Sequence, residues 1–157
     1  MVVKHRLADA SYWVYDRSRH TRAFEAASEL GTATDFSGFE RKQYAVLVTF
    51  RRDGTPVPTP VWFALLDGRR FMTSTERRTG KVRRIRSDPR VRVFPSDPRG
   101  KPLGPTVEGV ARLIDGGDEG ERAEDALDRK YGRARRIYER VMTRSEDMLY
   151  VEVVPAT

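Results

Sequence analysis

The chain of 157 residues contains no cysteine and only two histidines. Without cysteine it can form neither disulfides nor thiolate metal sites, and a reducing compartment, the cytoplasm, is expected. His5 and His20 have no ligand-like spacing to each other or to a pair of acids, so the sequence predicts no metal site.

Long apolar runs are also missing. No segment approaches the roughly 20 apolar residues of a membrane helix, so no membrane association is expected. The first 13 residues, MVVKHRLADASYW, lack the apolar centre of a secretion signal. A nucleophile elbow, a Walker loop and a dinucleotide-binding glycine fingerprint are absent too, which removes three common classes of enzyme from consideration.

Positive charge, by contrast, is abundant and concentrated. The chain has a net charge of +7, and the stretch from Arg77 to Arg92, with eight basic residues and one acid, carries an equal net charge by itself. Everything outside this stretch therefore sums to zero, which suggests one local site for an anion. The stretch has no interleaved aromatic residues and no nucleic-acid-binding motif, which argues against a nucleic-acid partner. The plain alternative is a solvated helix face.

Alternating and continuous apolar runs predict a mainly β fold. We expect strands at 44–50, 56–66, 69–75, 90–95, 106–114 and 148–154, and helices at 21–30, 79–86, 118–131 and 134–141. Asp53-Gly54 and Asp67-Gly68 predict two hairpins, and Gly109 predicts a bulge. Strands in the middle with helices toward the ends indicate a small antiparallel barrel with helical decoration. We assign residues 1–35 to an N-terminal extension, partly helical or mobile, and 36–157 to the barrel domain.

The second predicted strand contains two prolines at alternate positions, Pro58 and Pro60. Both remove N–H donors from the same edge of the strand, so we expect the sheet to open there. Such an edge either protects against aggregation or admits a flat ring, with Thr59 Oγ or the Val61 N–H bonding its heteroatoms. The second interpretation is preferred. The ring of Trp62 is expected in the core or at a dimer interface.

The end of the third strand and the helix after it carry the groups that a phosphate needs. Hydroxyls of Thr73, Ser74 and Thr75 precede a helix start with Lys81 in its first turn. Val82 and Ile85 are expected to face inward, which turns four cations toward solvent or a ligand: Lys81, Arg83, Arg84 and Arg86.

Four segments together resemble the FMN-binding split-barrel superfamily, typified by pyridoxamine 5′-phosphate oxidase, and within it the deazaflavin (F420)-dependent branch. They are LVTFRRDGTPVPTPVWFAL, FMTSTERRTGKVRRIRSDPRVRV, PTVEGVARLIDG and LDRKYG, in the family's order across residues 40–154. One departure favours the deazaflavin branch. The oxidase proper carries an Arg-Lys pair at its phosphate, whereas Thr79 and Gly80 precede Lys81 here.

The resemblance implies a six-stranded antiparallel split barrel that forms a homodimer, with cofactor sites between protomers. It implies that Thr59, Pro60, Val61 and Trp62 lie along the flavin or deazaflavin ring. It also implies that Thr73, Ser74, Thr75 and Lys81 hold the phosphate. The adjoining Arg78 and Arg84 are assigned to the same anionic arm, because F420 carries a polyglutamate tail besides its phosphate.

The leading hypothesis is an F420-dependent oxidoreductase that transfers a hydride to or from an unidentified small organic molecule. Hydride transfer fits a chain without an evident catalytic side chain, because the reactive atom belongs to the cofactor. No catalytic residue is assigned. Two alternatives remain: an FMN-dependent oxidoreductase of the same fold, and a non-enzymatic protein that binds a cofactor, haem or another small molecule.

Overall fold

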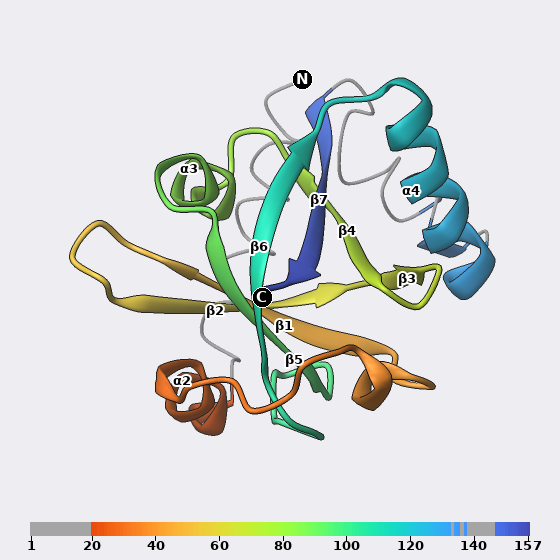
Figure 1. Ribbon diagram of the computed structural model, residues 1–157. Coiled ribbons are helices and arrows are strands. Elements are labelled where there is room, and N and C mark those ends of the chain that lie inside the picture. Colours follow the sequence, from red (N-terminus) through yellow and green to blue (C-terminus); the bar gives the residue numbers. More distant parts are fainter. Residues whose placement is uncertain (1–19, 133, 136, 138–146) are drawn as a thin grey trace.

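The computed structural model describes residues 20–132, 134, 135, 137 and 147–157, so the helix expected at 134–141 falls mostly outside the described residues. Seven antiparallel strands form one curled sheet (Figure 1). They are β1 (Tyr44–Phe50), β2 (Pro56–Trp62), β3 (Ala64–Leu66), β4 (Arg70–Glu76), β5 (Arg90–Ser96), β6 (Val107–Ile114) and β7 (Met148–Pro155). The predicted mainly β fold is confirmed, with strand ends within a residue or two of those expected.

The sheet closes on itself through one long strand that changes partner. Its order is β2-β1-β5-β6-β7-β4-β3, so β2 and β3, which are consecutive in the sequence, stand at opposite ends. Only Phe63 separates them. The segment 56–66 therefore acts as one strand of six, pairing with β1 in its first half and with β4 in its second. This is the expected six-stranded split barrel, open where β2 and β4 are not paired.

The two Asp-Gly hairpins form as predicted. Gly54 has a φ of 86° between β1 and β2, and Asp67 and Gly68 have φ values of 56° and 66° between β3 and β4. Two successive positive φ values define the turn whose twist matches that of paired strands, and Asp-Gly adopts them at low cost. These turns set the register in which the strands face the core.

Aromatic rings fill the interior of the barrel. Phe63 stacks on Phe71 with ring centroids 5.0 Å apart, and Phe39 meets both rings edge-on. Valines from β5, β6 and β7 complete this cluster. Because β1 is covered on both faces, its residues Ala45–Val48 are all fully buried, as its continuous apolar run predicts.

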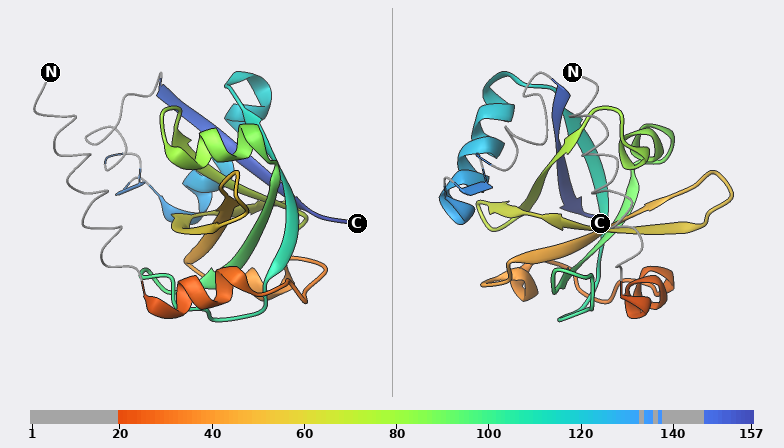
Figure 2. Two further views of the ribbon diagram at one scale, coloured as in Figure 1. Left: turned by 90° about the vertical axis from the view of Figure 1, so that its left-hand side faces the viewer. Right: turned by 180° about the vertical axis from the view of Figure 1, so that it is seen from behind.

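The helices cover the outside and the ends of the barrel (Figures 1 and 2). They are α2 (Thr21–Ser28), the short 3-10 helix η1 (Ser37–Phe39), α3 (Gly80–Ser87) and α4 (Gly117–Tyr131). Helices α2 and α3 lie on opposite sides of the β1–β2 hairpin, whereas α4 lies beside β3 and β4. Among the described residues, no helix combines the length and the apolar character that crossing a membrane requires.

Helix α2 buries a different face from the one expected. The spacing of Phe24, Ala27 and Leu30 predicts an apolar stripe, yet only Ala27 is buried, while Phe24 and Leu30 are 47% and 76% exposed. The buried residues are Ala23 and Ala27, one turn apart. Small side chains let the helix approach the barrel closely, which explains why size outweighs hydrophobicity here.

Polar contacts fix α2 and the segment after it to the barrel. Arg92 of β5 donates to the carbonyl of Ala27 and forms an ion pair with Glu108 of β6. The same carboxylate accepts the backbone N–H of Gly31 at 2.7 Å. One partly exposed arginine–glutamate pair therefore helps to hold the described part of the N-terminal extension against two strands.

The bulge predicted at Gly109 is absent, because β6 pairs in regular register with β5 and with β7 on either side of it. Glycine is required there for a different reason. A Cβ at this position would lie 2.5 Å from Val153 Cγ1 and 3.0 Å from the carbonyl oxygen of Val154. The two strands approach too closely for a side chain.

Gly109→Ala is therefore expected to destabilise the protein by about 1–3 kcal/mol, since the added methyl group overpacks the β6–β7 contact. The matched control is Gly38→Ala, whose Cβ would make an ordinary 3.5 Å contact with Pro105. Urea denaturation of both variants measures the difference, and equal midpoints would contradict this account of Gly109.

Candidate functional site

The free edge of β2 consists of prolines. Pro56, Pro58 and Pro60 alternate along a strand that pairs with β1 through all seven of its residues. Because proline cannot donate, the ladder must use the N–H groups of the residues between them, and the prolines face the opening. The N–H of Val61 is thereby directed to β1 rather than to the open edge. Of the two groups expected to bond the heteroatoms of a ring, this amide is directed to the ladder instead, and the role of Thr59 Oγ stays a prediction.

The four residues expected along the ring lie on two faces of β2. Thr59 and Val61 pair with Leu47 and Ala45, whose side chains belong to the barrel interior. The alternation places Pro60 and Trp62 on the outer face. Pro60 is buried on the side that α2 covers.

The ring of Trp62 stacks on that of Tyr131, with centroids 5.6 Å apart and planes at 26°. Within this chain the ring therefore contacts α4, and its place at a dimer interface stays a prediction. The side chain remains half-exposed. Trp62 thus marks the end of β2 where the strand changes partner.

The three hydroxyl residues at the end of β4 also divide between two faces. Thr73 donates to the carbonyl of Trp62 at 2.6 Å, which ties β4 to β2 near their junction. Thr75 lies 3.2 Å from the hydroxyl of Thr79, at the start of α3. Ser74 points the other way and accepts a hydrogen bond from Arg135. Of the three side chains, that of Thr75 lies nearest the helix start.

Helix α3 begins at Gly80 and turns Val82 and Ile85 into the core, as its spacing predicts. The cations of this helix are expected to face solvent or a ligand, and for Lys81 and Arg84 the first of these is wrong. Lys81 is 9% exposed, and Arg84 is half-buried with its Nε donating to the buried hydroxyl of Thr49 at 2.7 Å. Because α3 lies across the end of the barrel, even its polar face meets β1.

The guanidinium of Arg84 folds back over the first residue of its own helix. A Cβ at Gly80 would lie 2.7 Å from Nη1 of Arg84, so only glycine leaves room for that group. The start of a helix carries partial positive charge, and a cation placed there is repelled. Two positive elements held together favour an anion between or beside them.

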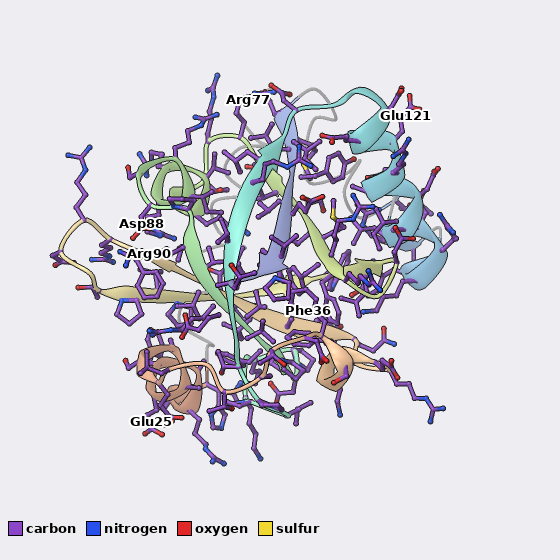
Figure 3. The ribbon with its side chains drawn as sticks, viewed as in Figure 1. Glu25, Phe36, Arg77, Asp88, Arg90 and Glu121 are labelled. Carbon is purple, nitrogen blue, oxygen red and sulfur yellow. The ribbon has the colours of Figure 1, made fainter. Side chains whose placement is uncertain are left out.

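Part of the basic stretch serves the fold instead. Arg77 forms a two-bond ion pair with Asp115, and its hydrogen bonds lower the pKa of that carboxyl. Arg90 pairs with Asp88 at the end of α3, where Figure 3 shows the two side chains together. Arg92 pairs with Glu108. The other five cations lie on α3 or just before it: Arg78, Lys81, Arg83, Arg84 and Arg86.

Lys130 and Tyr131 form a polar and aromatic cluster at the other end of β2, to which the sequence analysis assigns no role. The Tyr131 hydroxyl accepts the N–H of Phe63 at 2.8 Å and lies 2.7 Å from its carbonyl oxygen. Burial raises the pKa of Tyr131. The ammonium of Lys130 lies 3.3 Å from the centroid of the Phe63 ring. Burial lowers the pKa of Lys130 to about 8.

A signal for Lys130 was present in the helical periodicity. Ala123, Ala126 and Leu127 form the buried stripe of α4, and Lys130 continues it three and four residues later. A cation at a stripe position is uncommon unless something compensates it. The sequence LDRKYG resembled the family, but that resemblance assigned no role to its lysine.

The profile of the pyridoxamine 5′-phosphate oxidase family matches residues 35–156 of this sequence. The chain therefore belongs to that family. Comparison with curated proteins gives no significant match.

Solved structures with the same fold differ in what their names describe. A conserved hypothetical protein from Mycobacterium tuberculosis is 21% identical, over 82% of this chain and 87% of its own, with a TM-score of 0.61. A protein named F420 reductase is 23% identical over 80% and 96%, with a TM-score of 0.55. The haem storage protein HutZ from Vibrio cholerae is 12% identical over 75% and 84%, with a TM-score of 0.59. These likenesses show the split-barrel fold.

The lowered pKa of Lys130 predicts a pH dependence of stability. Between about pH 8 and pH 10.5 the folded lysine is neutral while the unfolded one is charged, so the unfolded state binds more protons and stability rises with pH. Below pH 8 the lysine is charged in both states, so it causes no change of stability with pH. The difference in unfolding free energy between the wild type and Lys130→Met is expected to shift in favour of the wild type from pH 7 to pH 9.5. Lys101→Met, at an exposed lysine, is the control. A constant difference in urea melts would contradict the lowered pKa.

Proposed function

We propose that the protein is an F420-dependent oxidoreductase that transfers a hydride between the deazaflavin and a small organic substrate. The observation that carries the proposal is the position of the Arg84 guanidinium over the start of α3. With Lys81 and the hydroxyls of Thr75 and Thr79 nearby, this end of the barrel has the donors that a phosphate-bearing arm requires. The F420 reductase among the structures of this fold adds support.

The chain's own groups divide the work along β2. The cations of α3, with Arg78 before it, would hold the phosphate and the acidic tail, whose negative charge is complementary to theirs. The proline edge cannot pair with another strand, and it leaves the free edge of β2 available to a flat ring. When bound, the deazaflavin supplies the hydride chemistry, while the barrel positions it and limits contact with water.

We further propose that the protein works as a cytoplasmic homodimer with its cofactor sites between protomers. The free edge of β2 and the half-exposed ring of Trp62 are the surfaces on this chain that a second copy would cover. Light scattering tests the dimer, which is expected at twice the chain mass of 18.0 kDa.

Cofactor titration tests the main proposal. F420 is expected to bind with a dissociation constant below about 100 μM, an affinity of roughly 5–6 kcal/mol. FMN and haem serve as competitors in the same fluorescence experiment. Tighter binding of FMN would favour the flavin-dependent alternative, and haem binding alone would favour a non-enzymatic carrier. Absence of F420 binding at this level would contradict the proposal.

Lys81→Ala is expected to weaken F420 binding by about 1–3 kcal/mol, because it removes a charge-assisted contact to the phosphate. Lys101→Ala, which removes an equal charge from an exposed turn, should leave the affinity unchanged. If both variants weaken binding equally, the effect is one of overall charge, and Lys81 has no specific role.

Gly80→Ala separates anion binding from stability. The new methyl group displaces the end of a flexible side chain rather than backbone, so the fold is expected to keep its stability or gain up to about 1 kcal/mol of helix propensity. The affinity for F420 should nevertheless fall at least about fivefold, since Arg84 is moved from the helix start. Unchanged affinity in a stable variant would remove Arg84 from the site.

A further inference from the structure

The ammonium of Lys130 lies over aromatic rings instead of beside hydrogen-bond acceptors. Its Nζ lies 3.3 Å from the centroid of Phe63 and 5.2 Å from that of Tyr131. Among the described residues it has neither a carboxylate nor a hydrogen-bond partner. Ring faces attract the charge of an ammonium, but they leave its three N–H donors unsatisfied.

Stability does not explain this arrangement. Phe63 is 1% exposed and stacks on Phe71, and covering its ring requires an apolar stem but no charge. Burial penalises the charged form of Lys130, as its lowered pKa shows. A methionine would cover the same ring with its stem and carry no such penalty. A cation kept at this cost is a candidate for binding.

Lys130 also lies far from the anion site at α3. Arg84 contacts Thr49, which pairs with Val57 near the start of β2, whereas Lys130 contacts Phe63 just after its end. Six residues of strand separate these two points, a length of roughly 20 Å. One phosphate cannot bridge such a distance. An anion that binds Lys130 is therefore a different group from the phosphate proposed at α3.

We propose that Lys130 binds the carboxylate of a flat, conjugated organic acid, and that this acid represents the substrate class of the protein. The carboxylate oxygens accept the ammonium donors, while the ring of Tyr131 beside the ammonium, which stacks on Trp62, suits a planar body. As an assignment of substrate, this inference rests on the proposed function, which places the cofactor ring along the same strand. As an assignment of a binding residue, it stands on the geometry of Lys130 alone.

The test uses the chain's small number of lysines. There are five, so reductive methylation with a carbon-13 label gives five lysine NMR signals besides that of the N-terminal amine, and Lys130→Met identifies the one of interest. In the cofactor-free protein this signal is expected to titrate near pH 8. Benzoate, the probe, should raise that pKa by on the order of 1 unit, because an opposite charge favours the protonated form. Benzamide, of the same shape without the charge, should leave it unchanged.

Binding of benzoate should fall at least about tenfold in Lys130→Met and survive in Lys130→Arg, which keeps the cation. Lys101→Met is the matched control and should bind as the wild type does. A Lys130 signal that ignores benzoate up to roughly 10 mM, or that moves no more than those of Lys42 and Lys101, overturns the proposal. The NMR result holds even if the methionine variant folds poorly.

The same samples separate this inference from the proposed function. If Lys130 responds to benzoate but F420 fails to bind, the anion site stands and the deazaflavin assignment falls. If F420 binds and Lys130 does not respond, the deazaflavin assignment stands and the anion site at Lys130 falls. With F420 bound, a tighter response to benzoate would place the acid beside the cofactor.

Discussion

The rest of the structure depends on the contact between Tyr131 and Phe63. Phe63 is the single residue at which a long strand leaves one end of the sheet and joins the other, and its backbone groups belong to neither ladder. The hydroxyl of Tyr131, half-buried at the end of α4, supplies a partner for both its N–H and its carbonyl. A buried backbone without such partners would be costly. The barrel therefore closes because a helix outside it completes the hydrogen bonds of the bend.

This closure divides the open side of the barrel into two chemically different ends. Strands β2 and β4 meet at Phe63, where Thr73 joins them through the carbonyl of Trp62. They separate toward α3, whose first turn brings together cations and hydroxyls. Aromatic rings and one lysine occupy the closed end. A long ligand with a charged arm and a flat body matches this polarity, which is why the proposed cofactor and substrate share β2.

The sequence predicts local features of this protein well and packing poorly. Strand ends, the two Asp-Gly turns and the proline edge follow from spacing and backbone chemistry, so they could be predicted. The burial of Lys81 and the inward reach of Arg84 could not, because they depend on α3 lying across the end of the barrel against β1. Lys130 was missed for a similar reason. Its stripe position was visible, but the ring that it covers comes from a residue 67 positions earlier in the chain.

The space over Gly80 links positions 80 and 84 of the sequence. The guanidinium of Arg84 fills the volume that a side chain at position 80 would need. An arginine at either position brings a positive group to the start of α3, but the two exclude each other. Relatives of this protein should therefore exchange the two residues in a correlated way, with glycine at the first accompanying arginine at the second. Such covariation would show that the arginine can stand at either of two positions one helical turn apart while its guanidinium occupies the same space.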